Sequence, residues 1–293
     1  MNDQLVRGTA WNGSIRVFAA RTTALVGELQ RRHDTYPTAT AALGRSATAA
    51  AMMGFMLKGD EKLTVQVKGD GPLGQIVIDA NAKAEVRGYV EEPHVHLPSN
   101  EHGKLDVAGA VGRSGYLHVI KDLGLKEPYR GSVPLISGEL GEDFTYYFAL
   151  SEQTPSAVGL GVLVDTDNSV LHAGGFIVQV MPGIEESQLV RLENAVAAMP
   201  HVTALLDQGE TPDSILRFLV GDDLVIHETI EPKFVCQCSQ ERVERTLISM
   251  GAEELRRLIE EDGEAEVQCH FCNEKYRFGR DQLSELLERA ASK

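Results

Sequence analysis

The 293-residue chain has only four cysteines, one tryptophan and no long apolar run. A bilayer span takes about 20 apolar residues, so we expect no membrane-spanning segment and no membrane partner. The N-terminus, Met1 to Arg7, lacks a basic start followed by an apolar stretch, so we expect no secretory signal. Hydrophobic residues make up 43% of the chain, which is enough for a buried core. We therefore expect a cytoplasmic protein of more than one domain.

Basic residues are also fewer than acidic ones. The chain has 28 lysines and arginines and 43 acidic residues, which gives a net charge of -15. An acidic surface repels phosphate backbones, so the composition argues against a nucleic-acid partner. The charge is uneven. Residues 181–231 carry two basic and ten acidic side chains, a net of -8. This segment folds against its own repulsion, and we expect it to need support from its neighbours.

All four cysteines lie near the C-terminus, as Cys236-Gln-Cys238 and Cys269-His-Phe-Cys272. In a reducing compartment, clustered cysteines indicate metal or redox chemistry and not a disulfide framework. Two close pairs separated by a helical span are what a four-thiolate zinc site needs. The pattern predicts one Zn²⁺ per chain with these four ligands, although the Cys-x-Cys pair is shorter than the usual structural-zinc spacing.

The spacing leaves two kinds of zinc site open. Most cysteine quartets are closed structural sites that only stabilise a small domain. A zinc-bound thiolate is, however, already deprotonated and remains a nucleophile toward oxidants. Cys236 and Cys238 could join once one becomes a sulfenic acid, and so could Cys269 and Cys272.

The hydrophobic periodicity predicts an α+β fold in three parts. These are an N-terminal domain of antiparallel sheet with packed helices (residues 1–180), a helical linker (181–231) and a small C-terminal zinc-binding domain (232–293). Asn12-Gly13 between two apolar-rich runs predicts a hairpin at the start, and Met181-Pro-Gly183 ends the first part. The last part has too few large apolar residues to fold unaided, so the metal is expected to hold it together.

Individual elements follow from the same pattern. In residues 1–180 we expect helices near 23–32, 37–57 and 155–161, and strands at 5–10, 15–19, 63–68, 74–79, 84–90, 105–107, 115–120, 144–150, 162–164 and 175–180. Beyond them we expect helices at 185–199, 202–206, 211–221, 241–250, 253–259 and 282–290, a strand within 222–231 and a hairpin within 266–278.

Other candidate sites are weaker. Gly159-Leu-Gly161 lacks the third glycine of a dinucleotide-binding fingerprint. His94, His96 and His102 share a loop and are interpreted as solvated side chains, since no carboxylate partner stands at helical spacing. Residues 1–180 contain no recognisable catalytic constellation, so we predict that the protein is not an enzyme.

Several motifs together resemble the 33 kDa chaperonin family of redox-switched heat-shock proteins. They are Val235-Cys236-x-Cys238 with Cys269-x-x-Cys272 and Tyr276-x-Phe278; Val65-Gln-Val-Lys-Gly-Asp-Gly71; Ala84-Glu-Val-Arg-Gly-Tyr89; Tyr147 to Ser156; and Gly174 to Gly183. The resemblance spans almost the whole chain and covers all four predicted metal ligands.

The resemblance implies a chaperone that works without ATP, as a holdase for unfolding proteins under oxidative and heat stress. The reduced, zinc-bound form would be inactive. Oxidation would link Cys236 to Cys238 and Cys269 to Cys272, release zinc, unfold the C-terminal domain and then the linker, and favour a homodimer. The linker would then expose a client-binding surface, for which its apolar helix positions are the candidates: Leu189, Leu192, Val196, Ile215, Phe218 and Leu219.

Two other classes of function remain open. A constitutive zinc-stapled protein-binding module without redox control would keep its metal under oxidants. An enzyme would need a titratable constellation in a pocket of the N-terminal domain.

Overall fold

The structure is a computed structural model that describes residues 2–100 and 103–291. The chain forms two compact units that divide between Val235 and Cys236. Within the described residues, no helix has both the length and the apolar character to cross a membrane. The fold is α+β with mainly antiparallel sheets, which confirms the predicted class.

A five-stranded sheet, sheet A, has the strand order β10-β1-β2-β9-β8, with every neighbouring pair antiparallel. Its first hairpin confirms the prediction from Asn12-Gly13, since both residues have positive φ angles, 55° and 88°. The final strand, β10, returns from the far end of the unit and pairs with β1 at the edge. The strands are β1 (Gln4–Ala10), β2 (Ile15–Arg21), β8 (Ser156–Val164), β9 (Val170–Val180) and β10 (Val225–Ile230).

A six-stranded sheet, sheet B, has the order β11-β5-β4-β3-β6-β7. The alternating pattern of Leu63, Val65 and Val67 places these three side chains in the core, as a period of two requires. Only the two-residue β11 runs parallel to its neighbour. The strands are β3 (Lys62–Lys68), β4 (Gln75–Asn81), β5 (Glu85–Val90), β6 (Tyr116–Asp122), β7 (Tyr129–Pro134) and β11 (Lys233–Phe234).

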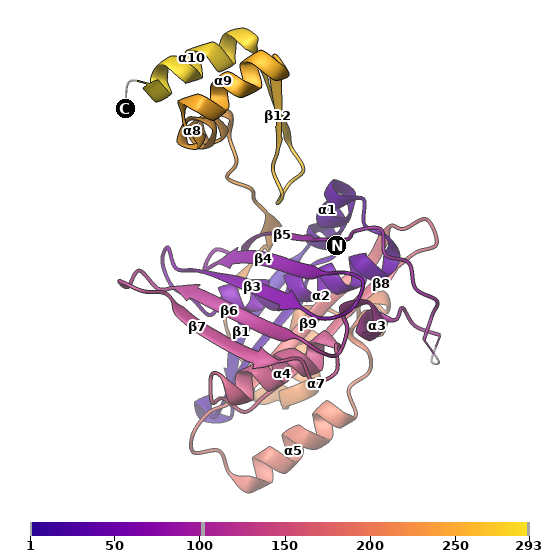
Figure 1. Ribbon diagram of the computed structural model, residues 1–293. Coiled ribbons are helices and arrows are strands. Elements are labelled where there is room, and N and C mark those ends of the chain that lie inside the picture. Colours follow the sequence, from indigo (N-terminus) through magenta and orange to yellow (C-terminus); the bar gives the residue numbers. More distant parts are fainter. Residues whose placement is uncertain (1, 101–102, 292–293) are drawn as a thin grey trace. The chain divides into compact units, whose positions relative to one another are not determined.

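Two helices, α1 (Thr23–His33) and α2 (Pro37–Gly54), complete the main core between the sheets. Helix α2 contacts β8 and β9 of sheet A as well as β3, β4 and β5 of sheet B. It is buried nearly all round, because its many alanines let both sheets approach closely. Figure 1 shows α2 among the strands of this unit.

Three further helices, α5 (Glu186–Ala197), α6 (Val202–Asp207) and α7 (Pro212–Val220), cover the opposite face of sheet A. The central strands of sheet A, β2 and β9, are therefore largely buried on both faces. This explains why β2 reads as an almost continuous apolar run from Ile15 to Ala20 and not as an alternating strand.

Three predicted elements are wrong. Residues 144–150 belong to helix α4 (Leu140–Leu150), because Phe144, Tyr147 and Phe148 share one buried helical face. Residues 156–161 are part of β8 and not a helix; Gly159 is needed there because a Cβ would lie 2.3 Å from the Phe176 ring. Residues 105–107 lead into helix α3 (Val107–Val111), which the Asp106 side chain caps. Strand β7 was not predicted.

The second unit has the predicted order of two helices, a hairpin and a closing helix. These are α8 (Gln240–Met250), α9 (Ala252–Glu261), β12 (Glu264–Gln268), β13 (Lys275–Gly279) and α10 (Arg280–Ala291). Its core contains six buried residues: Leu247, Ile248, Leu255, Phe278, Leu283 and Leu286.

Candidate metal centre

The four cysteines come from two segments of the second unit. Cys236 and Cys238 lie in the extended stretch before α8, whose N-cap residue Ser239 accepts a hydrogen bond from the backbone N–H of Arg242. Cys269 and Cys272 lie in the tight turn between β12 and β13. Asn273 takes a positive φ of 58° in this turn and its N–H donates to the Cys269 carbonyl at 2.8 Å.

The chain brings all four sulfur atoms to one point, where they lie within 4.8 Å of one another. The Sγ atoms of Cys236 and Cys269 are 3.8 Å apart, and those of Cys238 and Cys272 are 3.2 Å apart. These distances exceed a disulfide bond of about 2.05 Å, and the four side chains are thiols. No other group of described residues brings three or more potential metal ligands together in this way.

The donor set fits a tetrahedral ion. Four sulfurs at about 2.3 Å from a zinc ion are separated by about 3.8 Å, close to the observed spacing. Soft thiolates favour zinc over hard cations such as magnesium or calcium. The cluster is also shielded, since Cys272 is buried and the other three cysteines are half-buried. The geometry therefore suits a metal ion, with zinc the proposed occupant.

The thiols do not titrate alike. Burial raises the pKa of Cys272 and of Cys238 above the ordinary cysteine value. Burial opposes ionisation of Cys236 as well, but hydrogen bonds from the Cys238 backbone and from the neighbouring thiols outweigh it and lower the pKa of Cys236. A cation at the cluster would favour the thiolate forms, which burial opposes at Cys238 and Cys272.

One contact at this centre was not predicted. The Tyr276 hydroxyl, on β13, donates a hydrogen bond to Cys238 Sγ at 3.2 Å. This bond is the largest cause that raises the pKa of Tyr276, so the phenol stays a donor. Tyr276 was part of the motif that suggested the family, but its spacing of four residues from Cys272 was the only local sign of a role at the metal centre.

Neither His94 nor His96 belongs to a group of potential metal ligands among the described residues. His94 and His96 are exposed, and His94 contacts the Asp34 carboxylate at 3.3 Å. The prediction of solvated side chains is confirmed for these two, while His102 lies outside the described residues.

The six candidate client-binding residues lie on α5 and α7. Leu192, Ile215 and Leu219 are buried in the cluster that joins α5, α6 and α7 to sheet A, and Val196 packs against it. Leu189 is half-buried, whereas Phe218 is 46% exposed in the folded chain. The facing side chains of sheet A are Val6, Ile15, Val17, Ala19, Phe176 and Val178. Sequence reasoning missed this sheet surface, because long-range packing and not local pattern decides what covers it.

Polar contacts fasten the same helices to sheet A. The indole N–H of Trp11 donates to the Val220 carbonyl at 3.2 Å, and the Arg191 guanidinium lies 5.3 Å from the ring centroid. Arg21 donates to the Glu210 carbonyl at 2.8 Å. The single tryptophan is only 5% exposed and touches two of the covering helices, so it reports on their position.

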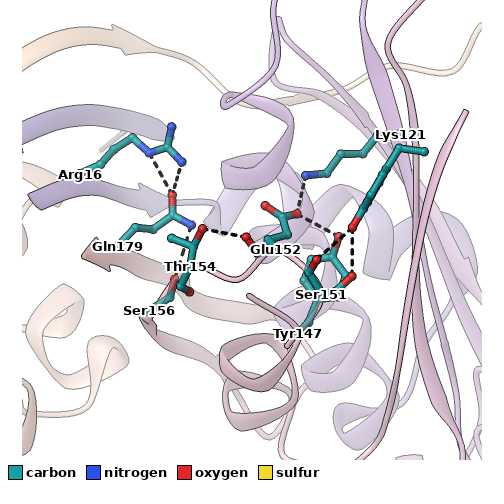
Figure 2. Close-up of polar contacts among 9 residues, drawn as sticks. Arg16, Lys121, Tyr147, Ser151, Glu152, Thr154, Ser156 and Gln179 are labelled. Carbon is teal, nitrogen blue, oxygen red and sulfur yellow. Dashed lines mark hydrogen bonds and ion pairs between the residues drawn. The ribbon is translucent and has the colours of Figure 1, made fainter. Parts of the chain in front are cut away.

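A second polar cluster surrounds the segment from Ser151 to Ser156 in the first unit (Figure 2). Glu152 accepts a hydrogen bond from the Tyr147 hydroxyl at 2.9 Å and forms an ion pair with Lys121 of β6. Burial raises the pKa of Tyr147, so its hydroxyl remains a donor. This half of the cluster ties the end of α4 to sheet B.

The other half ties the same segment to sheet A. The Ser156 hydroxyl donates to the Thr154 carbonyl at 2.9 Å, and the Gln179 amide reaches the Ser156 hydroxyl at 3.5 Å. Arg16 donates twice to the Gln179 side-chain oxygen, at 2.6 and 2.9 Å. Figure 2 shows these contacts as one chain of polar contacts from Arg16 to Lys121, which links sheet A to sheet B.

Comparison with known proteins agrees with the fold and the cysteine cluster. The family model described as Hsp33 protein matches residues 3–279. The 33 kDa chaperonin of Geobacillus sp. (strain WCH70) is 55% identical over 294 residues, covering 100% of both chains. That of Halalkalibacterium halodurans is 54% identical over 291 residues, covering 99% of this chain and 100% of the relative.

A solved structure extends the agreement to three dimensions. The crystal structure of the 33 kDa chaperonin from Thermotoga maritima has a TM-score of 0.94 and 38% sequence identity, with 100% of each chain covered. The chain belongs to the Hsp33 family, whose members are named chaperonins and not enzymes.

Proposed function

We propose that this protein is a redox-regulated, ATP-independent holdase that binds unfolding proteins under oxidative and heat stress. The observation that carries the proposal is the convergence of four sulfurs within 4.8 Å in a unit whose core has only six buried residues. A unit with so small a core depends on its metal, and a metal held by thiolates depends on their redox state.

Cys236, Cys238, Cys269 and Cys272 would hold one Zn²⁺ in the reduced, inactive form. When bound, the ion keeps the four sulfurs deprotonated and together. Hydrogen peroxide oxidises one thiol to a sulfenic acid and is reduced to water; the neighbouring thiol then displaces a second water and closes the disulfide. Two peroxides thus give the Cys236–Cys238 and Cys269–Cys272 disulfides. Disulfide sulfurs are no longer thiolate donors, so the chain loses its ligand set.

Losing the metal ligands removes a stabilising free energy that is large compared with the stability of a folded domain. Structural zinc contributes about 10–16 kcal/mol in small zinc domains. A whole domain is stable by only about 5–15 kcal/mol. Without its metal, the second unit, residues 236–293, is therefore expected to unfold. This unit makes up nearly all of the zinc-binding domain expected at residues 232–293, which is the proposed switch.

The linker, residues 181–231, is the proposed second step. It carries a net charge of -8, and its helices hold to sheet A through buried apolar side chains. Its release would uncover Leu189, Leu192, Val196, Ile215 and Leu219, while Phe218 is exposed before release. It would also uncover the matching face of sheet A, so the client surface would have two halves, one on the linker helices and one on the domain of residues 1–180.

The proposed partners are unfolded or partly folded client proteins and, in the oxidised form, a second copy of the chain. A net charge of -15 argues against nucleic acid as a partner. The thiol chemistry suits the reducing cytoplasm, where the switch would stay off until oxidants rise.

An aggregation assay tests the proposal. A chemically unfolded reporter enzyme is diluted into buffer with the reduced, zinc-loaded chain or with the chain oxidised by peroxide at mild heat. We expect suppression of light scattering by the oxidised chain only, together with zinc release and loss of four thiols. Retained zinc under peroxide, or equal suppression by both forms, would instead support a constitutive zinc-stapled binding module.

A further inference from the structure

Tyr276 is a non-cysteine side chain that donates a hydrogen bond to a sulfur of the cluster. Its hydroxyl lies 3.2 Å from Cys238 Sγ. The ring is half-buried against the small core of the second unit, and Tyr276 pairs with Val267 across the hairpin. The hairpin that carries Cys269 and Cys272 thus also directs a donor at the opposite cysteine pair.

Two further donors to the cluster belong to the main chain. The backbone N–H of Cys238 donates to Cys236, and that of Glu274 donates to Cys272. These bonds follow from the turns themselves and change only if the backbone changes. The bond to Cys238 is different, because one side-chain oxygen supplies it.

A hydrogen bond to a thiolate withdraws negative charge from sulfur, which makes the sulfur a weaker nucleophile and fixes its orientation as a metal ligand. We propose that Tyr276 is a positioning residue that sets how readily the switch opens: it holds Cys238 on the metal and slows its attack on peroxide. This inference rests on the proposed function, since it concerns the same cysteines.

The reaction that Tyr276 would slow is the first oxidation step. The Cys238 sulfur attacks one peroxide oxygen, the S–O bond forms as the O–O bond breaks, and hydroxide leaves and takes up a proton. The electron pair comes from sulfur, so any donor that holds that pair lowers the rate. Loss of this donor would therefore speed oxidation of the Cys236–Cys238 pair.

The test is Tyr276→Phe in the full-length chain, which keeps the ring and removes only the hydroxyl. Cobalt(II) titration, with zinc competition, measures metal affinity, and the cobalt–thiolate charge-transfer band reports on sulfur charge. We expect affinity to fall about tenfold to a hundredfold, as for other lost contacts to ligands, and the band to shift. A sulfur without this donor keeps more of its negative charge and is the stronger nucleophile, so peroxide should release zinc faster than from the wild type.

A matched control separates the hydrogen bond from packing. Val267→Ala removes apolar contact from the same cross-strand pair but leaves the hydroxyl in place. We expect it to lower the unfolding temperature of the zinc-loaded unit without moving the cobalt band. The inference is overturned if Tyr276→Phe matches the wild type in affinity, band and zinc release, or if Val267→Ala moves the band equally. A wild-type chain that binds neither metal overturns the proposed function and this inference together.

Discussion

Truncating Leu219 to alanine should loosen the helices over sheet A without touching the cysteines. Leu219 is 1% exposed on α7 and packs in the cluster that joins this helix to β1, β2 and β9. If the buried face of α7 holds the linker down, the alanine variant should release the linker more often. The second unit should be unaffected, because its core shares no residue with this cluster.

The magnitude follows from the burial. Replacing a fully buried leucine by alanine costs about 2–5 kcal/mol, since apolar contact is lost and a cavity remains. Each 1.4 kcal/mol changes an equilibrium tenfold, so the ratio of released to docked linker should rise by about 30-fold to several thousand-fold. This is a large share of the 5–15 kcal/mol that typically separates folded from unfolded states.

Trp11 provides the assay. Its indole N–H bonds to the Val220 carbonyl and its ring lies under Arg191, so release of α5 and α7 should expose it to water. We expect Leu219→Ala in the reduced, zinc-loaded chain to shift Trp11 emission to the red at lower urea than the wild type. Protease cuts between residues 181 and 231 should appear under the same conditions.

Phe218→Ala is the matched control on the same helix. Phe218 is 46% exposed, so its truncation should change the free energy of linker release by no more than about 0.5 kcal/mol. Equal responses from the two variants would refute the assignment of the buried α7 face as the contact that holds the linker. An unchanged transition in Leu219→Ala would refute it as well.

Three further perturbations test other parts of the molecule. Removing the metal with a chelator under reducing conditions should unfold residues 236–293, seen as loss of amide dispersion from that unit; a compact metal-free unit would contradict its dependence on zinc. Glu152→Gln leaves the half-buried Lys121 ammonium without its charged partner and should destabilise the first unit by about 1.5–3 kcal/mol in urea unfolding, whereas an unchanged midpoint would show that the pair is dispensable. Burial raises the pKa of Asp143, whose Oδ2 is buried without a partner, so the folded state keeps its proton where the unfolded chain has lost it. Stability should therefore fall as pH rises above about 4, the unfolded value, and level off above the raised pKa. The slope should decrease in Asp143→Asn, with the Asp3 carboxyl, whose pKa burial also raises, supplying the same sign of slope. An unchanged slope would assign it to other groups.

Local signals predicted the parts of the fold that local forces determine. The Asn12-Gly13 turn specifies a hairpin, Leu63 to Val67 alternates because one face of sheet B is solvated, and the two cysteine pairs meet because a hairpin carries one of them. The Ser239 cap and the glycines at 251 and 263 set the helix ends of the second unit.

The errors share a different cause. The segment of α4 from Phe144 to Leu150 has so many aromatic residues close together that its sequence resembles a buried strand. Only tertiary packing selects the helix. The first part of β8 was mistaken for a helix because glycines interrupt its pattern, and one of them, Gly159, is required by the Phe176 side chain of another strand. The Tyr276 hydrogen bond joins residues 38 positions apart and has no local signature.

The way the second unit is joined to the first explains how unfolding would pass along the chain. Only Val235 separates Cys236 from β11, a strand of two residues, and the Val235 N–H bonds to the Val86 carbonyl just before the cluster begins. The preceding strand, β10, lies at the edge of sheet A with four of its six side chains exposed, so backbone pairing to β1 is its main attachment. Edge pairing without burial is weak. In the proposed switch, these two short attachments would open once the metal unit no longer tethers residue 236. The charged linker helices, which hold to sheet A through their buried apolar face and the contacts of Trp11 and Arg21, would follow.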